Sequence, residues 1–157
     1  MEEILFVCTG NTCRSSMAEA FFNTAISGDS RLSGRFSAIS AGIAALSGQP
    51  ASINSLKVLE ADWGIDLSCH RSKGLSPGRV RDAFLILTMT RSHKAALLSA
   101  FPELGSKVFT LKEYAGATGD IDVKDPYGMP AETYRKCAKE IKDAVDKLVE
   151  KLKEYYR

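Results

Sequence analysis

A cysteine and an arginine near the start of the chain are separated by five residues, in a segment from Cys8 to Ser15 that reads Cys-Thr-Gly-Asn-Thr-Cys-Arg-Ser. Five intervening residues allow the backbone to curl so that successive N–H groups point at one anion. The arginine then returns over the same centre and binds two of its oxygens. The inward amides, the positive end of a following helix and Arg14 all favour an ionised sulfur on Cys8. The spacing therefore predicts a phosphate-binding loop whose thiolate is a nucleophile.

The sequence around this loop supports that prediction. A short apolar run, Ile4 to Val7, precedes the loop as a strand would. Gly10 permits the backbone to fold tightly against a ligand, and Ser15 and Ser16 supply small hydroxyls where a helix begins. The alternative is a cysteine that is buried as a small hydrophobe before an ordinary helix. That alternative leaves Arg14 unexplained, because arginine is costly to bury without an anionic partner.

A candidate acid lies near the other end of the chain. A thiolate that accepts a phosphoryl group needs an acid to protonate the leaving group. Asp125 stands in the sequence Asp125-Pro126-Tyr127-Gly128, where the proline stiffens the backbone and removes a competing amide donor. By itself, Asp-Pro more often marks only a turn. Together with the Cys8 loop, Asp125 indicates a hydrolase.

Hydrophobic periodicity predicts strands and helices in alternation. Strands are expected over residues 3–7, 36–40, 83–87 and 107–110, and helices over 15–27, 50–63 and 91–100, with a polar connection over 115–130. The apolar anchors expected in the second helix are Ile53, Leu56, Val58 and Leu59. This alternation is typical of a parallel sheet covered on both faces. The continuous apolar run at 83–87 suits a strand that is buried on both faces.

The last segment has the longest helical periodicity. Its apolar residues recur at alternating steps of four and three, at Tyr134, Ala138, Ile141, Val145, Leu148, Leu152 and Tyr155. Such a seam fits either a partner helix, as in a coiled-coil dimer, or packing on the chain's own sheet. We favour packing on the sheet, because a single terminal helix with fewer than four repeats usually packs that way.

Composition and charge exclude several classes of protein. The 157 residues are 45% hydrophobic and 25% charged, which fits one domain over residues 1–157. The formal net charge is +2, and no dense basic block argues for nucleic acid. No stretch approaches a transmembrane span, and the short apolar run after Glu2 and Glu3 lacks the features of a signal peptide. We therefore expect neither a nucleic-acid nor a membrane partner.

The four cysteines stand at positions 8, 13, 69 and 137. Their spacing fits neither a zinc site nor a disulfide framework. Free thiols indicate a reducing compartment, and together with the lack of an Asn-x-Ser/Thr acceptor they suggest the cytoplasm. Two interpretations of Cys13 remain: a reversible disulfide with Cys8 that protects the nucleophile from oxidation, or simple packing behind the loop.

The loop from Cys8 to Ser15, together with Asp125-Pro126-Tyr127, resembles the low-molecular-weight protein tyrosine phosphatase family. The resemblance covers essentially the whole chain. It implies a three-layer α/β/α, flavodoxin-like fold with a four-stranded parallel sheet and the phosphate-binding loop after the first strand. It also implies a phosphocysteine intermediate, with no metal and no other cofactor.

The resemblance further implies roles for individual residues. Cys8, Arg14 and Asp125 would be catalytic. Asn11 would order the loop, Ser15 would hydrogen-bond the thiolate, and Ser40 and His70 would support the loop from outside. The expected substrate-binding residues are Thr9, Gly10, Asn11, Thr12, Cys13, Ser15 and Tyr127.

The residue before the second loop cysteine bears on the substrate. Tyrosine phosphatases of this family usually carry Ile or Leu there, whereas Thr12 and the segments Met89-Thr90, His93-Lys94 and 108–114 resemble bacterial protein-arginine phosphatases. A threonine narrows the pocket and offers a hydroxyl toward a guanidinium. Tyr127 points toward tyrosine phosphatases, since many arginine phosphatases have Phe there. The expected partners are proteins carrying phosphoarginine or phosphotyrosine, and the expected product is inorganic phosphate.

Two other activities use a similar loop. An arsenate reductase needs a further cysteine pair to pass a disulfide outward, and the chain has no such pair between Cys69 and Cys137. A phosphocysteine carrier of a sugar-uptake system must avoid hydrolysis, so Arg14 and Asp125 argue against it. Both are weaker predictions than a phosphatase.

Overall fold

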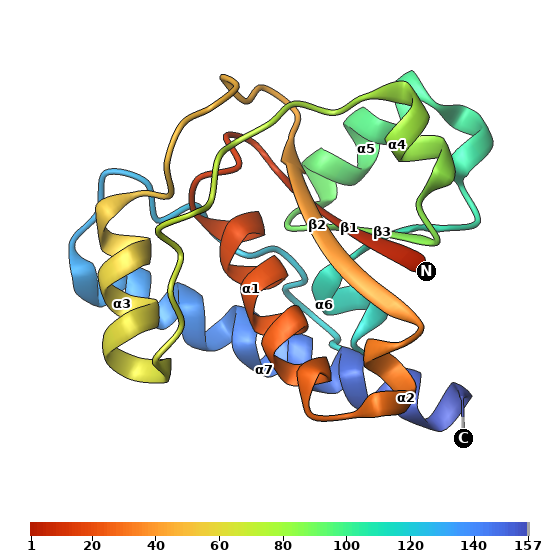
Figure 1. The fold of residues 1–157 in the computed structure, drawn as a ribbon. Helices are drawn as coiled ribbons and strands as arrows, with labels where there is room; N and C mark the ends of the chain where they lie inside the picture. The colour runs from red at the N-terminus through yellow and green to blue at the C-terminus, as the bar shows by residue number, and fades with distance from the viewer. Residues whose placement is uncertain (157) are drawn as a thin grey trace.

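The computed structural model describes residues 1–156 and is a three-layer arrangement of helices around a parallel sheet (Figure 1). The strands are β1 (Glu2–Cys8), β2 (Phe36–Gly42), β3 (Leu85–Thr88) and β4 (Val108–Thr110). The helices are α1 (Arg14–Ser27), α2 (Ser30–Ser33), α3 (Ile53–Trp63), α4 (Pro77–Asp82), α5 (Arg91–Ala100), the 3-10 turn η1 (Pro102–Leu104), α6 (Leu111–Tyr114) and α7 (Ala131–Tyr155). The four-stranded parallel sheet that the sequence predicted is confirmed.

The strand order is β2-β1-β3-β4, and all neighbouring pairs are parallel. The chain leaves β1 toward β2 on one side and later returns to β3 on the other. The carboxyl end of β1 is therefore a switch point, where crossover connections diverge and leave a crevice. Cys8 is the last residue of β1, so this topology places the sulfur in that crevice.

Alternate residues of β1 contribute to two separate cores. Ile4 and Phe6 join the core that includes side chains of α1, α3 and α7, whereas Leu5 and Val7 join the core that includes side chains of α4 and α5. All four side chains are fully buried. Because both faces of β1 are covered, the loop that follows it stands on a rigid base.

The long helix α7 packs on the molecule's own core, as we favoured from its periodicity. The seam from Tyr134 to Leu152 is buried in the first core and contacts α1 and α3. The prediction is wrong at Tyr155, whose side chain is 80% exposed. At this end of the helix Leu152 is still buried, and Tyr156 rather than Tyr155 packs against Phe36 of the first core, with ring centroids 5.4 Å apart.

Two further expectations change. Ile53, expected as an anchor of the second helix, is 69% exposed, because Ser52 caps α3 and its buried face is formed by Ser55, Val58 and Leu59. The third strand covers 85–88 rather than 83–87, because a short helix, α4, ends at Asp82 and Ala83 caps it.

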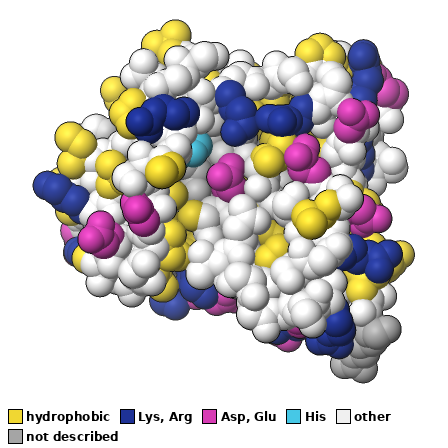
Figure 2. Space-filling view, in the orientation of Figure 1, with side chains coloured by type: hydrophobic (Ala, Val, Ile, Leu, Met, Phe, Trp, Pro, Cys, Tyr) yellow, Lys and Arg dark blue, Asp and Glu magenta, His cyan; other side chains and the backbone are white. Residues whose placement is uncertain are grey.

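The surface carries charges of both signs. On the face seen in Figure 2, Lys and Arg side chains form a row across the upper part, Asp and Glu side chains lie below and beside it, and apolar groups lie between them. Within residues 1–156, none of the helices combines the length and the apolar character that crossing a membrane requires.

Candidate active site

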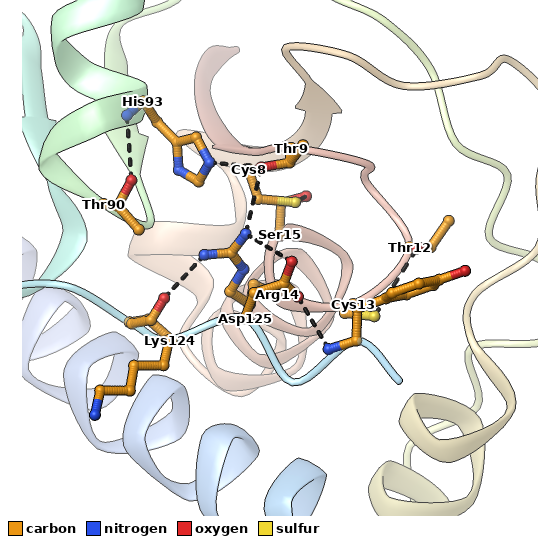
Figure 3. A network of polar contacts seen from close by, with 12 residues as sticks. Cys8, Thr9, Thr12, Cys13, Arg14, Ser15, Thr90, His93, Lys124 and Asp125 are labelled. Carbon is orange, nitrogen blue, oxygen red and sulfur yellow. Dashed lines mark hydrogen bonds and ion pairs between the residues drawn. The ribbon is translucent and has the colours of Figure 1, made fainter. Parts of the chain in front are cut away.

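A cavity of about 230 Å³ lies over the loop that joins β1 to α1. The lining residues come from this loop and from one distant segment: Cys8, Thr9, Gly10, Asn11, Thr12, Cys13, Arg14, Asp125 and Tyr127. The structure thus brings together the loop at one end of the sequence and the Asp-Pro segment near the other. Figure 3 shows Asp125 beside Arg14, next to the start of α1.

The sulfur of Cys8 is buried, with 2% of the residue exposed. Its Sγ lies 2.8 Å from Ser15 Oγ, and the backbone N–H of Asn11 donates to it over 3.3 Å. The sulfur therefore has two polar partners within the loop itself.

The loop curls because its carbonyl groups face outward and are bonded there. The carbonyls of Cys8 and Thr9 accept from the amides of Ile43 and Ala44, and that of Thr12 accepts from the Ser52 amide. A backbone whose carbonyls face outward turns its amides toward the centre. The segment after β2 and the cap of α3 therefore determine the shape of the anion-binding side.

Asn11 is the residue that makes the sharp turn possible. Its φ is +59°, in the left-handed region that asparagine tolerates better than most residues. A Cβ at Gly10 would meet Thr12 Oγ1 at an ordinary 3.8 Å, so the packing of the protein itself does not require a glycine there. The position where a glycine is required lies outside the loop, at Gly42 on β2.

The side-chain amide of Asn11 also fixes the direction of a hydrogen-bond network. Its Oδ1 accepts from the Lys73 amide, so its Nδ2 donates to Ser15 Oγ over 2.8 Å and to Ser40 Oγ over 2.9 Å. Ser40 Oγ in turn donates to Glu19 Oε1. Because Ser15 Oγ accepts from Asn11, its hydrogen is left for the sulfur of Cys8. The chain of donors thus runs from Asn11 to Cys8.

His70 lies on the outer side of the loop. Its Nε2 donates to the Asn11 carbonyl over 2.6 Å. Ser40 and His70 therefore both hold Asn11, one through its side chain and the other through its backbone.

Arg14 is buried although it carries a charge, with 4% of the residue exposed. Its Nη1 donates to the Val123 carbonyl over 2.9 Å, and its Nη2 lies 3.5 Å from Thr9 Oγ1. Nη2 also forms an ion pair at 3.6 Å with Asp125 Oδ2. These contacts orient the guanidinium fork at the cavity.

The side chain of Asp125 is half exposed. Its Oδ1 accepts from the Tyr127 amide two residues later, over 3.0 Å. This local turn leaves Oδ2 as the oxygen that faces Arg14. Tyr127 lines the cavity as well, and the residue is 74% exposed.

Cys13 lies at the back of the loop and is a free thiol. Its Sγ lies 3.4 Å from both Ser52 Oγ and Tyr134 Oη, and 3.9 Å from Thr12 Oγ1. Burial, followed by the hydrogen bond with Cys13, raises the pKa of Tyr134 to about 12, so the phenol is protonated near neutral pH.

One residue near the loop was not predicted as part of the site. His93, on α5, shares a hydrogen bond of 2.9 Å between its Nε2 and Thr9 Oγ1. Burial, followed by the nearby charge of Arg14, lowers the pKa of His93 to about 4, against smaller opposing effects of Asp125 and Asp122. The imidazole is therefore neutral at physiological pH. In the sequence, His93-Lys94 stood out only as a segment that resembles arginine phosphatases, and the contact with Thr9 exists because the fold places the start of α5 beside the loop.

Glu19 and Gly42 were also missed, and both lie outside the loop. The spacing of Glu19 on α1 is that of an ordinary helical residue. Gly42 follows Ser40-Ala41, and the sequence alone did not show that its hydrogen faces Thr9. Within residues 1–156, no group of three or more His, Cys, Asp or Glu side chains could hold a metal ion.

Comparison with known proteins decides the family. The model of the family described as low molecular weight phosphotyrosine protein phosphatase matches residues 3–157. The chain belongs to this family. The resemblance seen in the Cys8 loop and the Asp125 segment is thereby confirmed.

Members of this phosphatase family with different stated substrates are similar to the chain. A protein-arginine-phosphatase of Geobacillus stearothermophilus is 42% identical over 149 residues, which cover 95% of each protein. The crystal structure of a low molecular weight protein tyrosine phosphatase from T. tengcongensis is 47% identical, covers 96% of this chain and 99% of its own, and superposes with a TM-score of 0.88. Similarity alone therefore does not choose between the two substrates.

A third relative bears on the chemistry. The structure of the YwlE arginine phosphatase, in a cysteine-to-serine mutant with a phosphorylated active site serine, is 36% identical. It covers 96% of this chain and 95% of its own, with a TM-score of 0.88. In that mutant, the serine of the active site carries the phosphoryl group.

Gly42 should not tolerate a side chain. A Cβ there would lie 2.4 Å from the Thr9 carbonyl oxygen and 3.1 Å from the Asn11 amide. We expect Gly42→Ala to cost about 1 to 3 kcal/mol in the free energy of unfolding, as overpacking does, and to lower phosphatase activity by displacing the loop. Chemical denaturation and turnover of an aryl phosphate measure both effects.

The matched control is Gly74→Ala, because Gly74 pairs with Gly42 across an isolated bridge and a Cβ there would meet nothing within 4 Å. If Gly42→Ala and Gly74→Ala lost equal amounts of stability and activity, the close approach of Gly42 to Thr9 would not be the cause.

His93 should make stability depend on pH. The unfolded chain binds a proton at His93 below its ordinary pKa of 6.5, whereas the folded protein resists protonation down to about 4. The stabilisation is thus complete above pH 6.5 and is lost as the pH falls toward 4, by up to about 3 kcal/mol. Between pH 6.5 and 4, we expect the free energy of unfolding to fall less in His93→Gln than in the native protein. Parallel curves for the two proteins, measured by chemical denaturation, would show that His93 does not contribute.

Proposed function

We propose that this family member is a protein phosphatase that prefers phosphoarginine, accepts phosphotyrosine and small aryl phosphates, and acts through a phosphocysteine on Cys8. The observation that carries the proposal is the arrangement around the Cys8 sulfur. A buried Sγ receives hydrogen bonds from Ser15 and from the Asn11 amide, in a cavity that also holds Arg14 and Asp125. Donors aimed at sulfur stabilise a thiolate, and a thiolate is the nucleophilic form.

In the first step, Cys8 Sγ attacks phosphorus in line and forms the S–P bond. Arg14 and the loop amides bind the equatorial oxygens as charge redistributes. The bond from phosphorus to the leaving nitrogen or oxygen breaks, and Asp125 Oδ2 supplies the proton that the leaving group needs. The products of this step are phosphocysteine and the dephosphorylated side chain.

In the second step, the same carboxylate acts as a base. Asp125 takes a proton from water, whose oxygen attacks phosphorus, and the S–P bond breaks. Ser15 and the Asn11 amide stabilise the departing thiolate, and inorganic phosphate leaves. Proton balance is complete, because Asp125 regains in this step the proton that it gave in the first.

The preference for phosphoarginine rests on Thr12. This residue lines the cavity, where its hydroxyl can bond a guanidinium N–H and its methyl group narrows the space for a phenol ring. Tyr127 at the rim favours phosphotyrosine instead, which is why we assign both substrates. The expected partners are phosphorylated proteins, and the four free thiols fit a reducing cytoplasm.

The acid role of Asp125 predicts an effect that depends on the leaving group. In Asp125→Ala, the rate of phenol release under single-turnover conditions should fall by about 100-fold or more for phenols of high pKa. Phenols of low pKa, which leave without a proton, should be affected much less. Cys8→Ser should release no phenol under the same conditions.

The control for the acid is Asp120→Ala, which removes an exposed carboxylate from the same connection. Equal slowing of good and poor leaving groups in Asp125→Ala would contradict the acid role. A near-native turnover by Cys8→Ser would overturn the proposed function as a whole.

Thr12 predicts how substrate preference can be changed. Thr12→Ile removes the hydroxyl and adds apolar bulk, so the ratio of kcat/KM for phosphoarginine over phosphotyrosine peptides should fall by about tenfold or more, as loss of a polar partner does. Thr12→Ser keeps the hydroxyl and should retain most of the preference. An unchanged ratio in Thr12→Ile would show that Thr12 does not select the substrate.

A further inference from the structure

The segment that follows β3 reaches both sides of the Arg14 guanidinium. On one side, His93 Nε2 lies 2.9 Å from Thr9 Oγ1, and Thr9 Oγ1 lies 3.5 Å from Arg14 Nη2. In Figure 3 dashed lines connect the imidazole of His93 to Thr9 and Thr9 to Arg14. His93 therefore contacts Arg14 through a single hydroxyl.

On the other side, the contact runs through the backbone. Arg14 Nη1 donates to the Val123 carbonyl over 2.9 Å, and the Val123 amide donates to the Met89 carbonyl over 2.9 Å. Met89 is four residues before His93. One short segment thus holds the supports of both terminal nitrogens of the guanidinium.

This segment is itself firmly held. The Met89 amide donates to the Val7 carbonyl on β1, so the segment is fixed to the strand that carries Cys8. The hydroxyl of Thr90 accepts from the His93 amide and caps α5, while the Thr90 carbonyl accepts from Thr88 Oγ1. With 8% of the residue exposed, the imidazole has little freedom to turn away from Thr9.

The charge state of His93 is compatible with this position. A protonated imidazole next to a buried guanidinium would be repelled, and the lowered pKa of His93 keeps the ring neutral. Its Nδ1 is buried without a hydrogen-bond partner among the described residues. Leaving a buried polar atom unpaired costs free energy. A leucine or phenylalanine would avoid that cost. The hydrogen bond between Nε2 and Thr9 Oγ1 is therefore the feature that accounts for a histidine at this position.

We propose that His93 is a positioning residue, which orients Arg14 for the phosphoryl group through Thr9 Oγ1, opposite to the support that Met89 gives through Val123. This inference rests on the proposed function, because it assigns Arg14 to a phosphoryl group. His93 does not touch the reacting atoms. Its effect is on how well the guanidinium fork is held where the oxygens bind.

The test uses inorganic phosphate as the probe, titrated calorimetrically into each variant, together with kcat and KM for p-nitrophenyl phosphate. His93→Phe keeps a planar ring but has no polar atom, and it should weaken phosphate binding by about five- to tenfold, the usual effect of one lost hydrogen bond. KM should rise in parallel. His93→Gln, which can still bond Thr9, should stay within about twofold of the native protein.

A double-mutant cycle separates positioning from a general loss of structure. Thr9→Val should weaken phosphate binding about as much as His93→Phe does. The double variant should lose no more than the worse single variant, because both changes delete the same contact. Additive losses, or native affinity in His93→Phe, would overturn the inference.

Two outcomes need separate treatment. If His93→Phe does not fold, Thr9→Val and Thr9→Ser decide, since only the serine keeps the hydroxyl; equal phosphate affinity of these two variants would overturn the inference. If the native protein binds phosphate but does not hydrolyse any phosphorylated substrate, the proposed function fails. The titrations still measure whether His93 orients Arg14.

Discussion

The structure of the site depends on one constraint, which is that the polar groups around the Cys8 sulfur point toward it. That constraint is imposed from a distance. Glu19 accepts from Ser40, Ser40 accepts from Asn11, and the Lys73 amide fixes which end of the Asn11 amide donates. A carboxylate accepts but does not donate. The hydroxyls of Ser40 and Ser15, which lie between Glu19 and the sulfur, therefore each have one favourable orientation. In that orientation the hydroxyl hydrogen of Ser15 points to Cys8 Sγ.

The sheet supplies the frame that this network needs. Because β1 is paired on both sides and both of its faces are covered, the position of Cys8 is fixed before the loop begins. Segments that follow β2 and β3 end at the same edge, since the strands are parallel. The first binds the outward carbonyls of the loop and the second holds Arg14. The loop is thus shaped by three strand ends rather than by its own residues alone.

This dependence explains how far the sequence could be interpreted. Cys8 and Arg14 are close in the chain, and their types and spacing already indicate the chemistry, as the apolar runs indicate the strands. Asp125 could be predicted because the chemistry required an acid. Gly42 and His93 could not, because each acts through a contact with Thr9 that only the tertiary structure creates. Tyr155 was assigned wrongly because the next residue, Tyr156, makes the contact with Phe36 of the core, which the helical periodicity does not predict.

The burial of Arg14 indicates how the site gains free energy when a phosphoryl group binds. Removing a guanidinium from water is expensive unless an opposite charge compensates. Here the paired carboxylate, Asp125, is itself half exposed and 3.6 Å away, while the remaining contacts of Arg14 are a carbonyl and a hydroxyl. Neutral partners orient the guanidinium without cancelling its charge. A dianionic phosphoryl group completes that compensation, so part of the cost of burying Arg14 during folding is recovered when the substrate binds. An arginine that is rigidly oriented but incompletely neutralised is therefore suited to binding a phosphoryl group, because its strongest interaction is left for the ligand.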